Sequence, residues 1–178
     1  MNASVANLTI NNSGGVTLSG ATSITNLLTL SSGILTTTST NILTIPVGGI
    51  SGYSSSRYVK GPLAITSAVS TSPATLTFPI GSASYYSPVT LNVTQTAATA
   101  NTYTASVSNT VPNNTLPSGF INASTTRSYS ITTSGTNNIS AASIGLVYDA
   151  NDGSSLIANA SSLRILNCLL YTSPSPRD

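Results

Sequence analysis

The sequence predicts an all-β protein, in which a short parallel β-solenoid-like segment is followed by an antiparallel β-sandwich. Short runs rich in Leu, Ile, Val and Thr recur along the chain, and Gly, Ser, Asn and Pro separate them. These residue types are typical of strands and of turns, respectively. No window sustains the 3.6-residue apolar period of a helix. Only 4% of residues are charged, against about 25% in a typical domain, so hydroxyls and amides must form most of the surface.

Residues 1–50 contain five similar strand-like runs, spaced by roughly six to eleven residues, which favours a β-solenoid-like repeat. In a solenoid, apolar residues stack on the rung below and small polar residues turn the corners. Two or three antiparallel hairpins would give similar spacing and are the alternative. The runs are NLTI, VTL, LLTL, GILTT and NILTI. The residues expected to point inward are Leu8, Ile10, Val16, Leu18, Ile24, Leu28, Leu30, Ile34, Leu43 and Ile45.

Residues 51–56 are expected to form a linker, and 57–165 to form the β-sandwich. Eight short strand-like runs, separated by Pro- or Gly-bearing turns, match the strand number and spacing of such a fold. Leu76, Phe78 and Ile80 alternate with threonine, so they are expected to share one buried face. The expected strands are 58–59, 63–67, 75–78, 89–94, 103–107, 127–132, 143–148 and 162–165.

Residues 166–178 are expected to be a non-native tail, in preference to a natural Pro-rich tail. They contain the only cysteine, Cys168, and the peptide CLLYTSPSPRD resembles translated adaptor sequence. Met1 is not followed by the basic and apolar regions of a signal peptide. The sequence is therefore expected to be cut at both ends, with its export signal lying outside it.

Composition excludes several classes of function. A scattered net charge of +2 gives no basic patch for nucleic acid, and no apolar run approaches the ~20 residues of a membrane span. The absence of histidine excludes His/Cys metal sites and a Ser–His nucleophile. Asp149 and Asp152 lie in one turn and cannot flank a glycosidic bond as an acid and base would. We therefore expect no enzymatic activity and no cofactor.

Asp149 and Asp152 are the candidates for a calcium site, because an Asp-x-x-Asp-Gly turn offers carboxylates and carbonyls to a hard cation. The sequence favours the simpler interpretation, a hairpin turn in which these side chains bond the local backbone. Pairing of Arg127 or Arg164 with one of the aspartates is also expected, in a structural role.

Four of the five basic residues lie near the ends of expected strands, where charges protect sheet edges or meet solvent. They are Arg57, Lys60, Arg127 and Arg164.

Tyr85 and Tyr86 are the candidate ligand-contact residues. They occupy a turn, and an exposed tyrosine joins apolar area to a polar tip that suits contacts with sugars or proteins. The favoured alternative is a pair at the sandwich edge, with one ring packed inward and the other covering the loop.

Three stretches, VKGPLAIT (59–66), SPATLTFPIG (72–81) and YYSPVTLNVTQ (85–95), carry a resemblance to a known type of module. They are similar to blocks of large secreted, adhesin-like surface proteins of Bacteroidota-type bacteria, where such blocks follow repeats like LTLSSGILTTTSTNILTI. The similarity covers most of residues 7–165. It implies one module of a multi-domain surface protein, often ending in a sorting domain, and it brings no catalytic residues.

The sequence thus predicts a structural or adhesive module of a secreted or cell-surface bacterial protein. Its expected partners are neighbouring modules of a longer chain, and surface glycans or proteins. The alternative is a carbohydrate-binding accessory module of a secreted hydrolase. That function would need an exposed aromatic platform, for which the candidates are Tyr53, Tyr85, Tyr86 and Tyr103.

Overall fold

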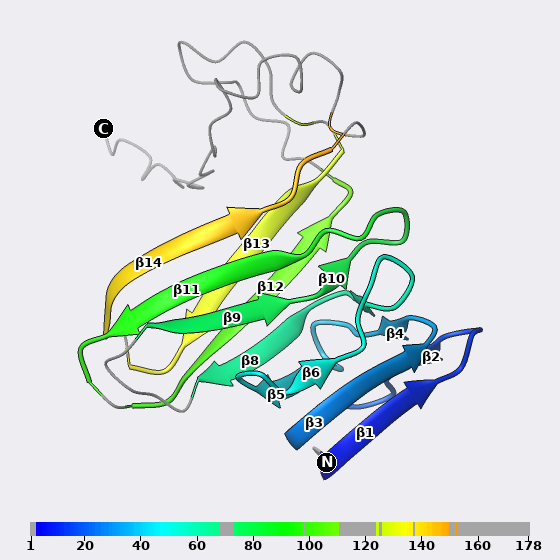
Figure 1. Cartoon of the computed structure of the whole chain (residues 1–178), viewed down its shortest axis with the longest axis horizontal. Coiled ribbons are helices and arrows are strands. Elements are labelled where there is room, and N and C mark those ends of the chain that lie inside the picture. The colour runs from blue at the N-terminus through cyan, green and yellow to red at the C-terminus, as the bar shows by residue number, and fades with distance from the viewer. Residues whose placement is uncertain are drawn as a thin grey trace, which may run out of the picture.

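The computed structural model describes residues 3–67, 73–97, 99–110, 124, 126–136, 138–149 and 152. These residues contain fourteen strands and no α-helix, so the described chain is all-β, as predicted. A β-solenoid-like region leads into antiparallel sheet (Figure 1). The expected strand at 162–165 and the expected tail at 166–178 lie outside the described residues.

Two parallel ladders form the solenoid-like region, which confirms the solenoid and not the hairpins. The first ladder runs in the order β1 (Ala3–Asn11), β3 (Thr22–Ser32), β5 (Leu43–Pro46) and β8 (Leu63–Ser67), and β6 (Ile50–Ser51) also pairs with β3. The second runs in the order β2 (Val16–Thr17), β4 (Leu35–Thr36), β7 (Val59–Lys60) and β10 (Ile80–Gly81).

One coil of this stack takes about twenty residues. Ala3 pairs with Thr22, Thr22 with Leu43 and Leu43 with Leu63, so successive partners are 19, 21 and 20 residues apart. Gly33 turns a corner with a φ of 79°. A side chain there would collide with the backbone of the preceding coil, so the position requires glycine.

Apolar residues stack through the interior from coil to coil. Val16, Leu35, Val59 and Ile80 form one such ladder across β2, β4, β7 and β10, and the last three are fully buried. The expectation that Ile34 points inward is wrong, because its neighbour Leu35 is fully buried and Ile34, unlike the other partly buried residues Leu8, Val16 and Leu18, does not pack against the core. Gly33, with its left-handed backbone, interrupts the alternation of inward and outward side chains, so Leu35 takes the inward position instead.

Residues 51–56, expected to be a linker, lie in the third coil. Ile50 and Ser51 pair with Leu28 and Thr29 of the second coil, and Ser54 and Arg57 exchange backbone hydrogen bonds of 2.8 and 3.1 Å. The parallel ladders continue as far as Gly81, within the region expected to be sandwich.

Two antiparallel ladders follow the coils. In the first, β12 (Asn101–Ser108) pairs with β8 and with β13 (Ser128–Ser134). In the second, β11 (Val89–Gln95) lies between β9 (Ala74–Phe78) and β14 (Ile139–Leu146). Leu76, Phe78 and Ile80 are all fully buried, as predicted. Both ladders and the coils contribute residues to one continuous apolar core, and Figure 1 shows β9, β11 and β14 in front of β12 and β13.

The outward face of the long sheet carries a row of small, uncharged residues. The inward positions are apolar, for example Ile65, which pairs with the buried Tyr103. One row of outward positions crosses the six strands and bears a hydroxyl on each of them except β8, where the residue is the buried Ala64. Partners in this hydroxyl row are Ser4, Ser23, Thr44, Ala64, Thr104 and Thr132. Side chains in the neighbouring row also bond, with the hydroxyls of Thr66 and Thr102 3.0 Å apart.

Candidate functional site

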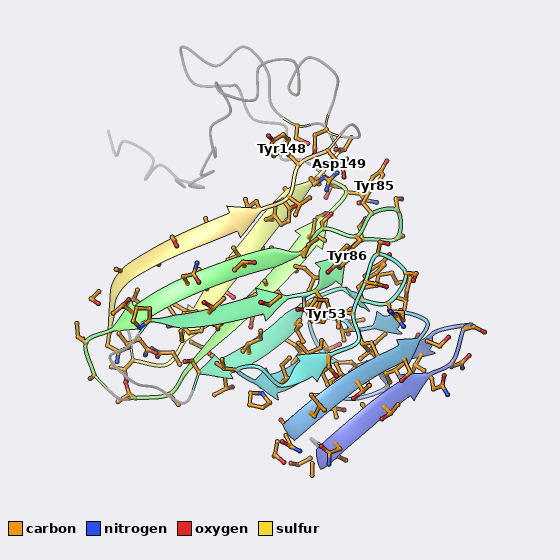
Figure 2. All side chains as sticks on the ribbon, in the orientation of Figure 1. Tyr53, Tyr85, Tyr86, Tyr148 and Asp149 are labelled. Carbon is orange, nitrogen blue, oxygen red and sulfur yellow. The ribbon has the colours of Figure 1, made fainter. Side chains whose placement is uncertain are left out.

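The candidate residues Tyr85, Tyr86 and Asp149 lie near one end of the β9–β11–β14 sheet (Figure 2). Tyr53 lies at the junction of coils and sheet, and Tyr148 lies beside Asp149 where β14 has ended. Two groups of contacts organise this end: a tyrosine pair around the turn that follows β10, and an arginine with two aspartates.

The turn that carries Tyr85 and Tyr86 is held by its own backbone. The Ser82 N–H donates to the Tyr85 carbonyl at 2.9 Å, and the Ser82 hydroxyl accepts the N–H groups of Ser84 and Tyr85 at 3.2 and 3.1 Å. The Ser87 N–H then returns to the Ile80 carbonyl at 2.9 Å. This short side-chain-capped turn fixes where both rings leave the backbone.

Tyr86 packs against Tyr58, a residue that sequence reasoning did not select. Their ring centroids are 5.6 Å apart at an interplanar angle of 44°, a tilted arrangement that aromatic pairs favour. Tyr58 is 4% exposed and donates its hydroxyl to the Ser82 carbonyl at 2.9 Å. Burial raises the pKa of Tyr58, and burial together with nearby Tyr53 raises the pKa of Tyr86. One face of the Tyr86 ring is thus covered by the protein.

Tyr85 lies under Arg127. The guanidinium carbon is 5.4 Å from the ring centroid, within the range of a cation–π interaction. Tyr85 and Tyr86 are both half-buried. Each therefore has a structural contact within the chain and keeps part of its surface for a partner.

Arg127 is buried, with 2% of its side chain exposed, so the expectation that it meets solvent or protects an edge is wrong. Its Nη2 donates to Asp149 Oδ1 at 2.8 Å and its Nη1 to the Ser87 hydroxyl at 3.0 Å. The expected pairing of Arg127 with an aspartate is thereby confirmed. Its Nε lies 2.9 Å from Asp152 Oδ1 as an ion pair without hydrogen-bond geometry. Burial lowers the Arg127 pKa, but the hydrogen bonds to Asp149 and Tyr129 and the charge of Asp152 together outweigh it, and the pKa is raised.

The buried carboxylate of Asp152 is bonded on both oxygens. Oδ1 accepts the hydroxyls of Ser124 and Thr126 at 2.8 and 3.1 Å. Oδ2 accepts the Asp149 N–H at 2.8 Å, and the Asp152 N–H donates to the Asp149 carbonyl at 2.9 Å. This is the turn chemistry that the sequence favoured, with an arginine added. We call Arg127, Asp149 and Asp152 the arginine clasp.

The arginine clasp takes up the carboxylate oxygens of Asp149 and Asp152 that a calcium ion would need. A calcium ion takes 6–8 oxygen ligands, and a guanidinium already occupies the space beside the near oxygens of both carboxylates. Within the described residues, no three His, Cys, Asp or Glu side chains gather as a metal cluster would require. The arrangement is an internal ion pair that joins the 82–87 turn to the segment after β14.

The tyrosines proposed for an aromatic platform differ in exposure and do not all reach the surface. Tyr53 is 39% exposed and lines a small hollow of about 100 Å³, together with Ile50, Thr75 and Thr77. Tyr103 is 1% exposed, so its inclusion in a platform is wrong. It faces the core because it alternates with the outward Thr102 and Thr104 on β12. Tyr148, which the sequence did not single out, is the most exposed large apolar residue described, at 51%.

A buried amide network was also missed. Asn138 Oδ1 accepts Nε2 of Gln95 at 2.9 Å and Nδ2 of Asn101 at 2.6 Å. Its own Nδ2 donates to the Ala97 carbonyl at 2.8 Å and the Thr99 hydroxyl at 2.7 Å. The network joins the β11–β12 loop to the turn before β14. Polar residues are so frequent in this chain that no sequence signal marks these three.

A shallow hollow of about 310 Å³ lies against the second parallel sheet. Its lining is small and mostly uncharged, and Lys60 is its one charged residue. The lining consists of Gly14, Gly15, Val16, Thr17, Ile34, Thr36, Lys60 and Ala83. It offers hydroxyls and backbone without a convergent polar group, so it has no evident chemistry.

The described part of the chain contains no helix with the length and apolarity needed to cross a membrane. No protein-family model, no curated protein and no solved structure matches this chain. The interpretation of its function therefore rests on its own residues.

Proposed function

We propose that the protein is a structural and adhesive module of a secreted or cell-surface bacterial protein, without catalytic activity of its own. The observation that carries this proposal is the hydroxyl row. This uncharged row crosses six paired strands from Ser4 to Thr132 and bears a hydroxyl on five of them, the exception being the buried Ala64. Such a face supports many hydroxyl and amide contacts with a glycan or protein surface, and salt does not screen them.

The architecture suits a spacer. Coils of about twenty residues stack on one another, and each coil pairs its strands with those of the next coil, as in repeat proteins. We infer that the two antiparallel ladders form a β-sandwich that closes this stack, since both contribute to the same core as the coils. In such a module the coils set reach, the sandwich supplies a stable end, and neighbouring modules of a longer chain are the natural partners.

Adhesion can be tested directly with beads that carry the protein. The beads should be retained under shear on glass coated with mucin or with a plant or microbial polysaccharide. Retention should be the same at low and high ionic strength. A lysine in the hydroxyl row, Thr104→Lys, should reduce retention, while Thr90→Lys on the other sheet should leave it unchanged. Retention no greater than that of bare beads on every surface would refute the adhesive role.

The structural role without catalysis has its own measurement. The protein should release no reducing sugar from the same polysaccharides over long incubation. Release by the wild type that persists through repeated purification would contradict the proposal.

A carbohydrate-binding accessory module is the second candidate, and the exposed Tyr53 favours it. Tyr53, Thr75 and Thr77 line the same hollow, and a combination of an aromatic ring and hydroxyls suits one sugar unit. Tyr53→Ala should then abolish retardation in polysaccharide-containing gels. Tyr148→Ala, which removes an exposed tyrosine elsewhere, is the matched control. Equal migration of wild type and Tyr53→Ala in all gels would exclude this function.

A further inference from the structure

The stack of coils is interrupted on one of its faces. On the other two faces the parallel ladders continue into the fourth coil, where β8 pairs with β5 and β10 pairs with β7. On the third face β6 pairs with β3, and no described strand pairs with the other edge of β6. The strand between β8 and β10 in the chain, β9, pairs antiparallel with β11 instead. Among the described residues, β6 and β9 therefore each have one edge without a strand partner.

The hollow of about 100 Å³ that Tyr53 lines lies at this break. Ile50 of β6 and Thr75 of β9 both contribute to its wall. Ile45 and Ile65, which pair with each other and are each 1% exposed, form an apolar floor. Strand edges without a partner also leave backbone N–H and C=O groups that need hydrogen bonds. The hollow thus combines an aromatic ring, an apolar floor and polar groups, as sites for small polar ligands do.

A row of polar side chains leads from the hollow across the β9–β11–β14 sheet (Figure 1). Thr75 pairs with Asn92 and Asn92 pairs with Ser143, so the three side chains lie on three neighbouring strands. The Thr75 hydroxyl donates to Asn92 Oδ1 at 2.7 Å, and Asn92 Nδ2 donates to the Ser143 hydroxyl at 3.3 Å. The row faces outward, because the next residues along β9 and β10's neighbour β11, Leu76 and Leu91, are buried. We call Thr75, Asn92 and Ser143 the polar track.

The polar track can both donate to and accept from the hydroxyls of a sugar. Asn92 Nδ2 carries a second hydrogen, and the Ser143 hydroxyl, which accepts from Asn92, keeps its own hydrogen. Thr75 and Ser143 are exposed. No charged residue lines the hollow or belongs to β6, β9, β11 or β14. A uronate or sulfate group would find no counter-charge at this surface, which therefore suits an uncharged ligand.

We propose that the hollow and the polar track together bind one extended chain of a neutral polysaccharide, which crosses β9, β11 and β14. One sugar unit contacts Tyr53 in the hollow, and the following units lie along the track. Neighbouring strands are about 4.8 Å apart, close to the length of one sugar unit in an extended chain, so the site spans about three units. This inference rests on the carbohydrate-binding function proposed above and adds the charge, shape and length of the ligand.

Affinity electrophoresis followed by calorimetry tests the proposal. Gels that contain xylan, laminarin, galactomannan or hydroxyethyl cellulose present neutral chains, and gels that contain polygalacturonate present a charged one. A neutral polymer should retard the wild type, and polygalacturonate should not. Oligosaccharides of the retained polymer, from the monosaccharide upward, are then titrated. Affinity should rise by at least about tenfold as the chain lengthens to about three units, and it should level off beyond that length.

Asn92→Ala removes the centre of the polar track and leaves the hollow intact. It should weaken binding of the longer oligosaccharides about tenfold and leave binding of the monosaccharide unchanged. The matched control is Asn7→Ala, which removes a strand amide that bonds Asn26 on the coils and should change neither. Melting curves of both variants should stay close to that of the wild type.

Three outcomes would each overturn the proposal. They are an affinity that does not grow beyond the first sugar unit, equal retardation by polygalacturonate, and an Asn92→Ala protein that binds long oligosaccharides as the wild type does. If Tyr53→Ala still loses retardation in any of these cases, the carbohydrate-binding function stands without the track. A wild type that no gel retards would exclude that function as well, so the two failures are distinguishable.

Discussion

Replacing Arg127 by methionine tests whether the arginine clasp stabilises the protein. Methionine keeps the length of the side chain and removes the charge and the donors. Asp152, which is 5% exposed, then loses its buried counter-charge, and the Ser87 hydroxyl loses its donor. Tyr85 also loses the guanidinium above its ring.

The expected cost follows from how deeply each partner is buried. Breaking a buried ion pair by removing one partner costs about 3–5 kcal/mol. The lower end applies, because Asp152 keeps three uncharged donors, from Ser124, Thr126 and the Asp149 N–H. The pair with Asp149 adds less, since that side chain is 40% exposed. We expect a loss of about 3 kcal/mol, which lowers the melting temperature by about 6–12 °C.

Urea unfolding, with the slope fitted for each variant, measures the loss of unfolding free energy. A double-mutant cycle then shows how much of that loss belongs to the pair of Arg127 and Asp152. Asp152→Asn should cost about 1–2 kcal/mol and Asp149→Asn less than about 1 kcal/mol. The double variant Arg127→Met with Asp152→Asn should be more stable than the sum of the single changes predicts, by about 1–2 kcal/mol, because it leaves no buried carboxylate without its counter-charge. Additive effects would show that Arg127 and Asp152 do not stabilise each other. A free energy of unfolding for Arg127→Met within about 0.5 kcal/mol of the wild-type value would show that the clasp contributes no stability.

Three further predictions concern the amide network, a coil corner and alkaline pH. Asn138→Ala removes the acceptor that the buried amides of Gln95 and Asn101 share, although Gln95 keeps its bond to the Thr99 carbonyl, and it should cost about 3 kcal/mol in urea unfolding. Asn7→Ala on the exposed face should cost under about 0.5 kcal/mol. Equal losses of stability in the two variants would show that the amide network does not stabilise the protein. Gly33→Ala should destabilise by more than about 2 kcal/mol or prevent folding, whereas Gly20→Ala, with open space around it, should be neutral in thermal melts; a neutral Gly33→Ala would contradict the corner geometry. Burial raises the pKa of Tyr58 above 10.0. The stability that its neutral phenol contributes is therefore complete below pH 10.0 and is lost as pH rises through the folded-state pKa. Circular dichroism would follow unfolding as a function of pH. A Tyr58→Phe variant that loses stability in alkali as much as the wild type would disprove this role of Tyr58.

The sequence predicted the strands well because alternation is a local property. Thr75–Phe78 and Val89–Thr94 alternate between apolar and polar residues, and a strand with one buried face requires that pattern. Both segments occur as strands, and their apolar residues are buried. The parallel coils were also foreseeable, since similar runs recurred with small residues between them. The register was not, because a single glycine corner moved Leu35 into the position expected for Ile34.

The candidate site was only partly predictable. Tyr85 and Tyr86 were recognised as a pair, but their contacts, Arg127 and Tyr58, lie 42 and 28 residues away in the chain. Nothing local to Arg127 distinguishes an arginine at a strand start that faces water from one that crosses the end of the sheet.

The amino-acid sequence by itself determined that this protein is all-β, has an uncharged polar surface and begins with repeated coils. Composition and alternation act between residues close in the chain, so they can be read without a fold. The tertiary structure alone decided which strands pair with one another and that Arg127 is buried between Asp149 and Asp152. Those features depend on distances between segments far apart in the chain, and chain closure and packing set such distances only when the whole fold has formed.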